Sequence, residues 1–378
     1  MYAAQAVMLV YIQSLGLTQN HLSLAQAVFV VTIFVASIPS GWIADRYSRP
    51  LCLVVSNGIT AAGFVWYMGV TTLTGVLVAE VLLGIGGALS FGASSSLTAA
   101  YAELENRLVG KTYSRLTAAS TAVGAIVIAL GGWIGAYSPR AALGLSAGLF
   151  VAAMILSLVL KEPRPRRASE VSISSSVLGA LREMGKGIRY ALHENNRLKW
   201  VIIAMCTGTQ IGRGLLWVQS TLYLMSGMSA AWVGLAWILY IGPAAFGSYV
   251  LEHFVERWSR IKLFLAPALV SLGAMAVLAI AVTPWTIGMF VIIGLTAGWC
   301  SALFRVLIQR EGDDDELSFT KSVGQCVNIV IYVVVTFVVG WVASRFGAQA
   351  AIVANISMFL PIVLLCGWKL SRPRKQVV

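Results

Sequence analysis

Charged side chains are scarce in this 378-residue chain. They make up 11% of the residues, whereas a soluble domain carries about 25%. Apolar residues make up 58%, and a soluble fold of this size could not cover its surface with so little charge. The soluble classes of protein are therefore excluded. Ten-residue segments of alternating hydrophobicity, which the strands of a membrane barrel need, are also lacking.

Cysteine and histidine are few and scattered. The three histidines form no cluster, no two cysteines have metal-binding spacing, and none lies in an expected outer loop where a disulfide could form. We interpret the cysteines as small buried apolar residues: Cys52, Cys206, Cys300, Cys326 and Cys366. Neither a Ser-His-Asp set nor a paired intramembrane carboxylate occurs, so we expect no enzyme, metal or cofactor.

Long apolar runs are what the chain has instead. Most are close to twenty residues long, which as a helix crosses a hydrocarbon core about 30 Å thick. Inside that core only a helix satisfies its own backbone. We therefore predict an all-α membrane protein with twelve transmembrane helices, at 2–15, 24–44, 51–70, 74–98, 113–133, 141–160, 200–225, 230–251, 263–282, 285–308, 323–343 and 348–370.

The positive charge lies on one side of these spans. Apart from Arg140, Arg213 and Arg345, the 27 Lys and Arg residues fall in alternate loops or in the span ends beside them. Positive residues accumulate on the cytoplasmic side of a membrane, so these loops and the C-terminus are expected to be cytoplasmic. The net charge of +12 thus indicates topology and no nucleic-acid partner.

A short charged turn occurs twice. Asp45-Arg46-Tyr47-Ser48-Arg49 is matched 211 residues later by Glu256-Arg257-Trp258-Ser259-Arg260, again between apolar runs. This repeat predicts two similar six-helix halves, at 1–160 and 200–378, joined by a cytoplasmic linker at 161–199. Apolar residues recur at helical spacing from 177 to 192, which predicts an amphipathic helix on the membrane surface.

The repeat also predicts a shortened first helix. Gly16 aligns with Gly227 at the same offset, so the counterpart of the span at 200–225 would begin before Met1. The run 2–15 rises only about 20 Å as a helix. We expect a first helix that is truncated at its cytoplasmic end, and lower activity than in a version extended upstream.

Two charges, Glu80 and Arg213, lie well inside the expected spans. Glu80 lies about 9 Å from the outer start of its span and Arg213 about 18 Å from the outer end of its own. A charge in hydrocarbon costs at least about 2.5–3.5 kcal/mol, so it normally faces a partner or water. A structural pair and a role in substrate handling both explain these two residues.

Several amides also lie inside the expected spans. Gln210, Arg213 and Trp217 recur at helical spacing and share an expected face that suits an anionic or polar-aromatic solute. Such stripes more often join helices than bind a solute, and further amides lie at Gln5, Gln13, Gln219, Gln325 and Asn328. The glycines Gly84, Gly86 and Gly87 are interpreted as helix-packing positions, because no phosphate-loop Lys-Ser/Thr follows them.

The turn at 41–50 resembles the signature turn of the major facilitator superfamily, Gly-x-x-x-Asp-Arg/Lys-x-Gly-Arg-Lys/Arg. Gly41, Asp45, Arg46 and Arg49 match this pattern, whereas Ser48 and Pro50 depart from it. The resemblance covers the whole chain through its spans, central loop and half-repeat. It implies a cytoplasmic gate made by Gly41, Asp45, Arg46 and Arg49 in the first half, and by Glu256, Arg257 and Arg260 in the second.

A finer resemblance lies in the fourth span. Glu80-x-x-x-Gly84-x-Gly86, followed by Phe91-Gly92-Ala93, is similar to a bacterial drug-efflux-like branch. It implies a monomeric antiporter of the bacterial cytoplasmic membrane that exports small amphipathic compounds in exchange for protons. Many proton-coupled members carry Arg near the Glu80 position, and the Gly-Pro motif of the fifth span is half present here, as Gly131-Gly132.

The predicted function is secondary transport of a small molecule by alternating access. Glu80 is the expected coupling residue, and Arg213 is its switchable partner or the substrate anchor. Two alternatives remain: uptake of an anionic solute through Arg213, and a non-transporting sensor or assembly partner with the same fold. A channel is disfavoured because no repeated ring of acids or carbonyl-lining sequence is visible.

Overall fold

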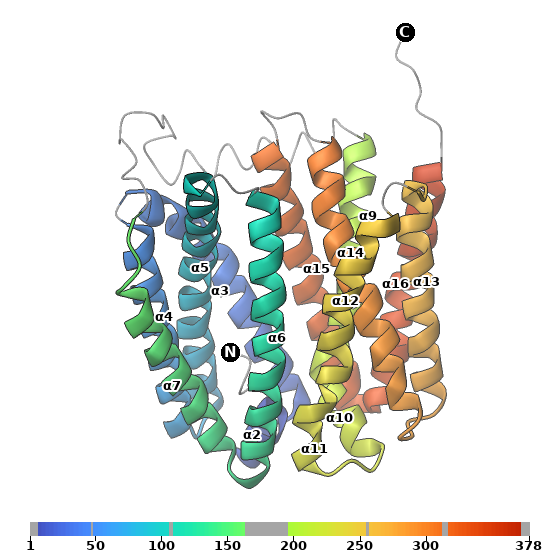
Figure 1. Cartoon of the computed structure of the whole chain (residues 1–378). Coiled ribbons are helices and arrows are strands. Elements are labelled where there is room, and N and C mark those ends of the chain that lie inside the picture. Colours follow the sequence, from blue (N-terminus) through green and yellow to red (C-terminus); the bar gives the residue numbers. More distant parts are fainter. Residues whose placement is uncertain are drawn as a thin grey trace. The chain divides into compact units, whose positions relative to one another are not determined.

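The computed structural model describes residues 7–46, 48–105, 109–162, 196–254, 257–311 and 317–371. These residues form helices and no strand (Figure 1). Eleven helical segments within them are long and apolar enough to cross a membrane. The predicted all-α membrane fold is therefore confirmed. The expected surface helix at 177–192 lies outside the described residues, as does the start of the first span.

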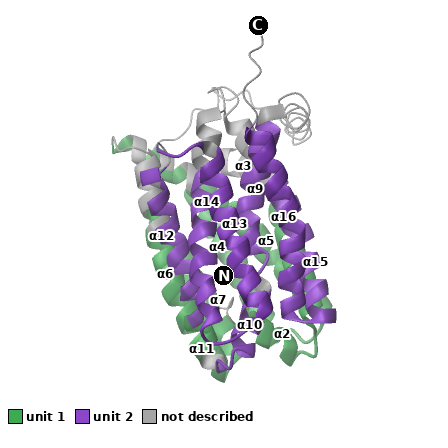
Figure 2. Cartoon of the chain, turned by 90° about the vertical axis from the view of Figure 1, so that its right-hand side faces the viewer, with its two compact units in different colours: residues 1–181, 230–235 green, residues 182–229, 236–378 purple. Residues whose placement is uncertain are grey.

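The chain divides into two compact units (Figure 2): residues 1–181 with 230–235, and residues 182–229 with 236–378. Besides residues 230–235 of the short α11 (Ala230–Ala236), the described part of the first unit contains six helices, one short and five long. They are α2 (Met8–Ser14), α3 (Gln19–Arg46), α4 (Arg49–Gly69), α5 (Leu73–Leu104), α6 (Val109–Tyr137) and α7 (Pro139–Ser157).

The turn between α3 and α4 shows why Ser48 and Pro50 stand where the family pattern has other residues. Ser48 is extended, and its side chain accepts a hydrogen bond from the backbone N–H of Leu51. Pro50 lies in the first turn of α4, where its missing N–H costs nothing. Ser48 and Pro50 together form a helix start.

Helix α5 lies in closest contact with α3 and α4, and two glycines make this possible. A Cβ added at Gly84 would lie 2.6 Å from the Cβ of Thr32 on α3. One added at Gly86 would collide with the Thr60 hydroxyl on α4. The interpretation of these glycines as packing positions is confirmed.

The described residues of the second unit form eight further elements. They are α9 (Asn196–Arg213), α10 (Leu216–Met225), α12 (Ile238–Phe254), α13 (Arg260–Ile280), the 3-10 turn η2 (Thr286–Gly288), α14 (Met289–Glu311), α15 (Leu317–Phe346) and α16 (Ala348–Ser371). Helix α14 packs against α12, α13 and α9, and α16 packs against α13, α15 and α9. The short α11 (Ala230–Ala236) precedes α12 in the chain.

The predicted spans at 200–225 and 230–251 are present, as spans at 198–225 and 232–251, but the helix is interrupted inside each of them. Leu215 N–H bonds to the Gly212 carbonyl, three residues back, at 3.3 Å. The Ile211 carbonyl, the usual helical acceptor, instead accepts from Nδ2 of Asn355 on α16 at 3.0 Å. In a buried segment a carbonyl that leaves the helical ladder needs such a partner.

The second break follows the same rule. Tyr240 N–H bonds to the Trp237 carbonyl at 3.1 Å, three residues back, and the Ala236 carbonyl instead accepts from the Tyr223 hydroxyl at 2.9 Å. Each break is thus held by a polar side chain from another segment.

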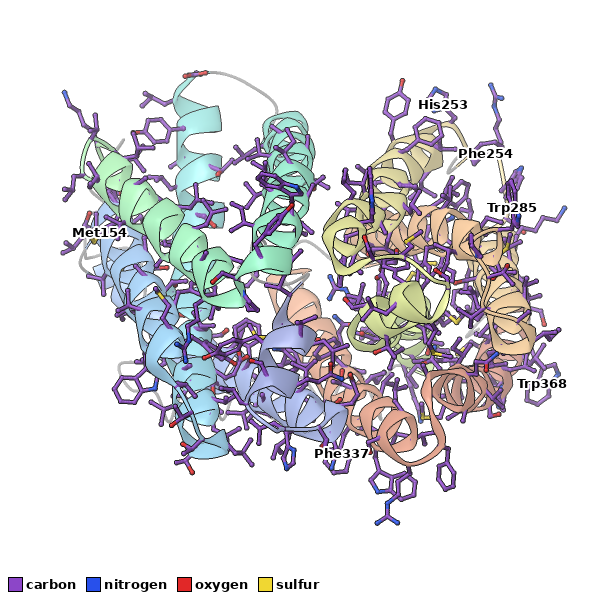
Figure 3. All side chains as sticks on the ribbon, turned by 90° about the horizontal axis from the view of Figure 1, so that it is seen from below. Met154, His253, Phe254, Trp285, Phe337 and Trp368 are labelled. Atoms are coloured by element: carbon purple, nitrogen blue, oxygen red, sulfur yellow. The ribbon has the colours of Figure 1, made fainter. Side chains whose placement is uncertain are left out.

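Apolar side chains cover much of the outer surface of each unit. In the second unit Trp285, Phe337 and Trp368 are exposed and point outward from the helices (Figure 3). Such a surface suits lipid rather than water. The cysteines Cys52, Cys206, Cys300 and Cys366 are buried, as expected, and the Cys326 side chain lies outside the described part of the chain.

Candidate functional site

Glu80 lies on α5 and is fully buried in the first unit. Its Oε1 accepts hydrogen bonds from the Tyr67 hydroxyl of α4 at 2.9 Å and from Nε2 of Gln26 of α3 at 3.0 Å. Tyr67 and Gln26 are buried as well. Within the described chain Glu80 forms no ion pair, so a carboxyl at membrane depth is held by neutral donors alone.

The first helix completes this cluster. The Tyr11 hydroxyl of α2 donates to the Tyr67 backbone carbonyl, and its ring meets the Tyr67 ring edge-on with the centroids 5.9 Å apart. Four helices of the first unit thereby meet around one carboxyl. We call Tyr11, Gln26, Tyr67 and Glu80 the Glu80 cluster. Its chemistry suits the binding and release of a proton.

Arg213 is the last residue of α9 and lies at the first helix break. Its side chain is exposed, and the buried Tyr240 of α12 lies within its electrostatic range. Broken helices near the membrane midplane are where many transporters bind their solutes, because the break frees polar backbone groups. Arg213 therefore has the position and the charge of a candidate anchor for an anionic group.

The Gln210 side chain is not exposed as the Arg213 side chain is. It is fully buried, and its Nε2 donates to Oδ1 of Asn328 on α15 at 2.8 Å. Thr209 donates to the same Asn328 oxygen at 3.0 Å. These contacts join α9 to α15. Gln210 and Arg213 thus differ in exposure, and the predicted face that they share with Trp217, which lies on α10 beyond the break, stays a prediction. The Trp217 side chain lies outside the described residues.

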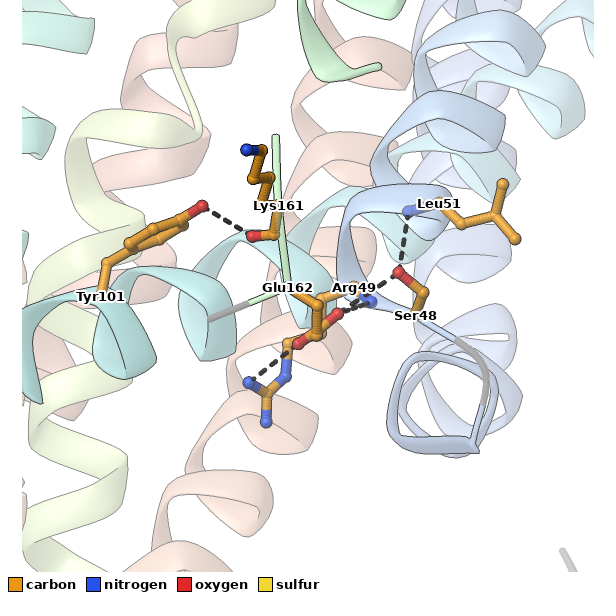
Figure 4. A network of polar contacts seen from close by, with 6 residues as sticks. All are labelled: Ser48, Arg49, Leu51, Tyr101, Lys161 and Glu162. Carbon is orange, nitrogen blue, oxygen red and sulfur yellow. Dashed lines mark hydrogen bonds and ion pairs between the residues drawn. The ribbon is translucent and has the colours of Figure 1, made fainter. Parts of the chain in front are cut away.

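The signature turn contacts the segment that follows α7 through one acid, Glu162 (Figure 4). Oε1 of Glu162 lies 3.4 Å from Arg49 Nη1, and its Oε2 accepts from the Arg49 backbone N–H at 3.0 Å and the Ser48 hydroxyl at 3.3 Å. A carboxylate at a helix N-terminus is favoured by the helix dipole. Nearby, Tyr101 of α5 donates to the Lys161 carbonyl at 2.6 Å.

Most other gate residues have side chains outside the described part of the chain. The backbone of Gly41, Asp45 and Arg46 continues α3, but their side chains, Glu256 and the Arg260 side chain lie outside the described residues, while Arg257 is exposed. Glu80 belongs to the first unit and Arg213 to the second, so their pairing stays a prediction.

Sequence reasoning did not identify five residues that make the hydrogen bonds described above. They are Gln26, Tyr67, Tyr11, Glu162 and Asn355. Gln26 and Asn355 are amides inside apolar spans, which is itself a signal of a helix-to-helix hydrogen bond. Glu162 follows the sixth span directly and is an acid among basic residues. Tyr11 and Tyr67 carry no such signal, because a tyrosine in an apolar run looks like an ordinary core residue.

Comparisons with known proteins agree with this architecture. A family model described as Major Facilitator Superfamily matches residues 1–328. A search of the curated proteins found no match. The nucleoside transporter NupG has a similar structure, with a TM-score of 0.78, 13% identity and coverage of 98% of this chain and 96% of NupG.

Two other solved structures are also similar. A bacterial homolog of the human lysosomal transporter Spinster, in an inward-facing unoccupied conformation, has a TM-score of 0.76 at 14% identity, covering 100% of this chain and 96% of that one. A POT family transporter in complex with 5-aminolevulinic acid has a TM-score of 0.69 at 14% identity, covering 98% and 93%. At such identities these likenesses establish the fold alone.

Proposed function

Because this chain belongs to the major facilitator superfamily, we propose that it is a proton-coupled antiporter that exports small amphipathic compounds. The observation that carries the proposal is Glu80, a fully buried carboxyl in a membrane span whose described partners are the neutral Tyr67 and Gln26. A charge is costly at this depth without a counter-charge. A bound proton neutralises Glu80 and removes this cost, so binding and release of a proton there can be coupled to transport.

In this proposal the protein alternates between inward-open and outward-open states. Glu80 gains a proton from one side and loses it to the other, and the energy of that passage drives the compound the opposite way. The signature turn, with Arg49 against Glu162, closes the cytoplasmic side. The efflux direction rests on the resemblance of the fourth span to efflux transporters, with Glu80, Gly84 and Gly86 as its matching positions.

The test uses purified protein in proteoliposomes and a compound first chosen by its effect on thermal stability, since a ligand stabilises the state that it binds. An antiporter accumulates the compound when the vesicle interior is acidic, because protons leave as the compound enters. Glu80→Gln should abolish this accumulation and retain binding. Glu170→Gln, the same chemical change in the linker, should not affect it.

Passive trapping of weak bases in an acidic interior is measured in vesicles without protein and subtracted. Equal gradient-driven accumulation by the wild type and Glu80→Gln would contradict the proposal, and so would accumulation that is independent of the pH gradient.

Uptake of an anionic solute is the second candidate, and the exposed Arg213 at the break after α9 favours it. A symporter accumulates its solute when the vesicle exterior is acidic, so the opposite gradient separates the two candidates. Arg213→Ala should then weaken binding of anionic compounds most, while Arg213→Lys retains part of it. Accumulation with an acidic interior alone would exclude this candidate.

A further inference from the structure

The Glu80 cluster contains two buried acceptor oxygens that have no hydrogen-bond partner among the described residues: Oε2 of Glu80 and Oε1 of Gln26. Both belong to side chains that are already joined, because Gln26 Nε2 donates to Glu80 Oε1 at 3.0 Å. Buried polar atoms are almost always hydrogen-bonded. The two unpartnered oxygens therefore indicate a component that completes the contact.

We propose that this component is the transported proton, held by Glu80 and Gln26 together as a carboxylic acid–amide pair. The proton binds Oε2 of Glu80 and is donated to Oε1 of Gln26. The existing bond from Gln26 Nε2 to Glu80 Oε1 forms the other half of the pair. A carboxylic acid and a primary amide match as donor and acceptor at both positions, so one proton satisfies both unpartnered oxygens.

Loss of the proton has the opposite effect. Without it both oxygens are acceptors, and neither can bond to the other, so half of the contact between α3 and α5 opens. This change affects the packing of α3 and α5, because the two helices are in close contact one turn further along, where Gly84 faces the Phe29 carbonyl and Thr32. Gln26 is thereby the residue through which protonation of Glu80 acts on α3.

Few other titratable or charged groups lie around Glu80 that could hold the proton with it. From α4 it faces Tyr67, and behind Tyr67 lies Tyr11 of α2, on which Arg140 of α7 acts electrostatically. The described side chains of α6 include Tyr137, at its C-terminal end, as their sole titratable group. The part of α3 that bonds to Glu80 supplies the neutral Gln26.

This inference rests on the proposed function, in which Glu80 carries the coupling proton. It is tested by infrared difference spectroscopy of the full-length protein in lipid, with glutamine labelled at the side-chain carbonyl carbon. Acidification should produce an acid C=O band that is lost in Glu80→Gln, together with a shift of a glutamine side-chain band that is lost in Gln26→Leu. Gln219→Leu, which also removes a buried span amide, should leave both signals in place.

A position exchange provides the second arm. Glu80→Gln removes the acid, and Gln26→Glu places two acids side by side, so each single variant should lose most pH-driven transport. The double variant Gln26→Glu/Glu80→Gln restores one acid and one amide on exchanged helices, and transport should return at least partly. Recovery of this kind distinguishes a proton-holding pair from two residues that merely fill space.

Three results would overturn the inference. One is a Glu80 acid band that appears without any change at the Gln26 amide. Another is normal pH-driven transport in Gln26→Leu. The third is a Gln26 shift caused by Na⁺ at constant pH, which would make the pair part of a metal-ion site. Paired band shifts in a protein without pH-driven transport would support the acid–amide pair and contradict the proposed function instead.

Discussion

Gly214 and Asn355 are in such close contact that the helix break after Arg213 depends on the absence of a side chain at position 214. A Cβ added to Gly214 would lie 2.5 Å from Oδ1 of Asn355 and 2.7 Å from Cγ1 of Val335. The same Asn355 side chain donates from Nδ2 to the Ile211 carbonyl. One buried amide of α16 thus fixes the broken segment that carries Arg213.

Gly214→Ala is therefore expected to destabilise the protein. Overpacking a tight site costs about 1–3 kcal/mol, and Asn355 cannot move away without leaving the Ile211 carbonyl unpaired. The measurement is the melting temperature in detergent, which should fall. Gly273→Ala is the matched control, because nothing lies within 4 Å of a Cβ there. Equal melting temperatures for the two variants would contradict the assigned contact.

Tyr67→Phe tests the hydroxyl that bonds to Glu80. It removes a buried hydrogen bond from a carboxyl whose other oxygen already lacks a partner, and should cost about 1–3 kcal/mol of stability. We also expect weaker pH-driven transport. Tyr249→Phe, at an exposed tyrosine, should change neither stability nor transport. A Tyr67→Phe variant indistinguishable from this control would show that the bond is dispensable.

Glu162 should matter more than Arg49 to the contact between α4 and the segment that follows α7. Glu162 accepts bonds from the Arg49 side chain, the Arg49 backbone and the Ser48 hydroxyl, whereas the Arg49 guanidinium supplies one of these three. Partly exposed ion pairs contribute only about 0–1 kcal/mol. Arg49→Gln should thus lower the melting temperature less than Glu162→Ala does. The reverse order would mean that the Ser48 and backbone bonds are unimportant.

Asp45→Asn tests the proposed gate itself. The substitution removes the charge of the signature turn but keeps its size, so transport should slow while the amount of protein in the membrane stays at the wild-type level. Transport is measured in proteoliposomes with a matched quantity of each protein. An unchanged rate would count against a gating role for Asp45.

Much of the fold was predictable, because membrane helices are fixed by length and apolar content, which a single sequence displays. The breaks after Arg213 and at Trp237 were not. Each depends on a partner distant in the chain, Asn355 for Ile211 and Tyr223 for Ala236, and no local pattern reveals such a pairing.

The candidate site was predictable in part for the same reason. Glu80 stands out in the sequence because a charge in an apolar run is rare. Tyr67 does not stand out, and Gln26 signals a hydrogen bond between helices without naming its partner, since both roles come from the packing of α3 and α4 against α5. Sequence reasoning therefore found the acid and missed the groups that determine what the acid can do.

Proton movement caused by the transported compound tests the central claim most directly. Proteoliposomes are loaded with a pH-sensitive dye, no pH gradient is imposed, and the compound is added outside. The account predicts that the interior becomes more alkaline as the compound enters and protons leave, and that Glu80→Gln shows no such change although it still binds the compound. Compound entry without any proton movement in the wild type, or the same proton movement in Glu80→Gln, would contradict it.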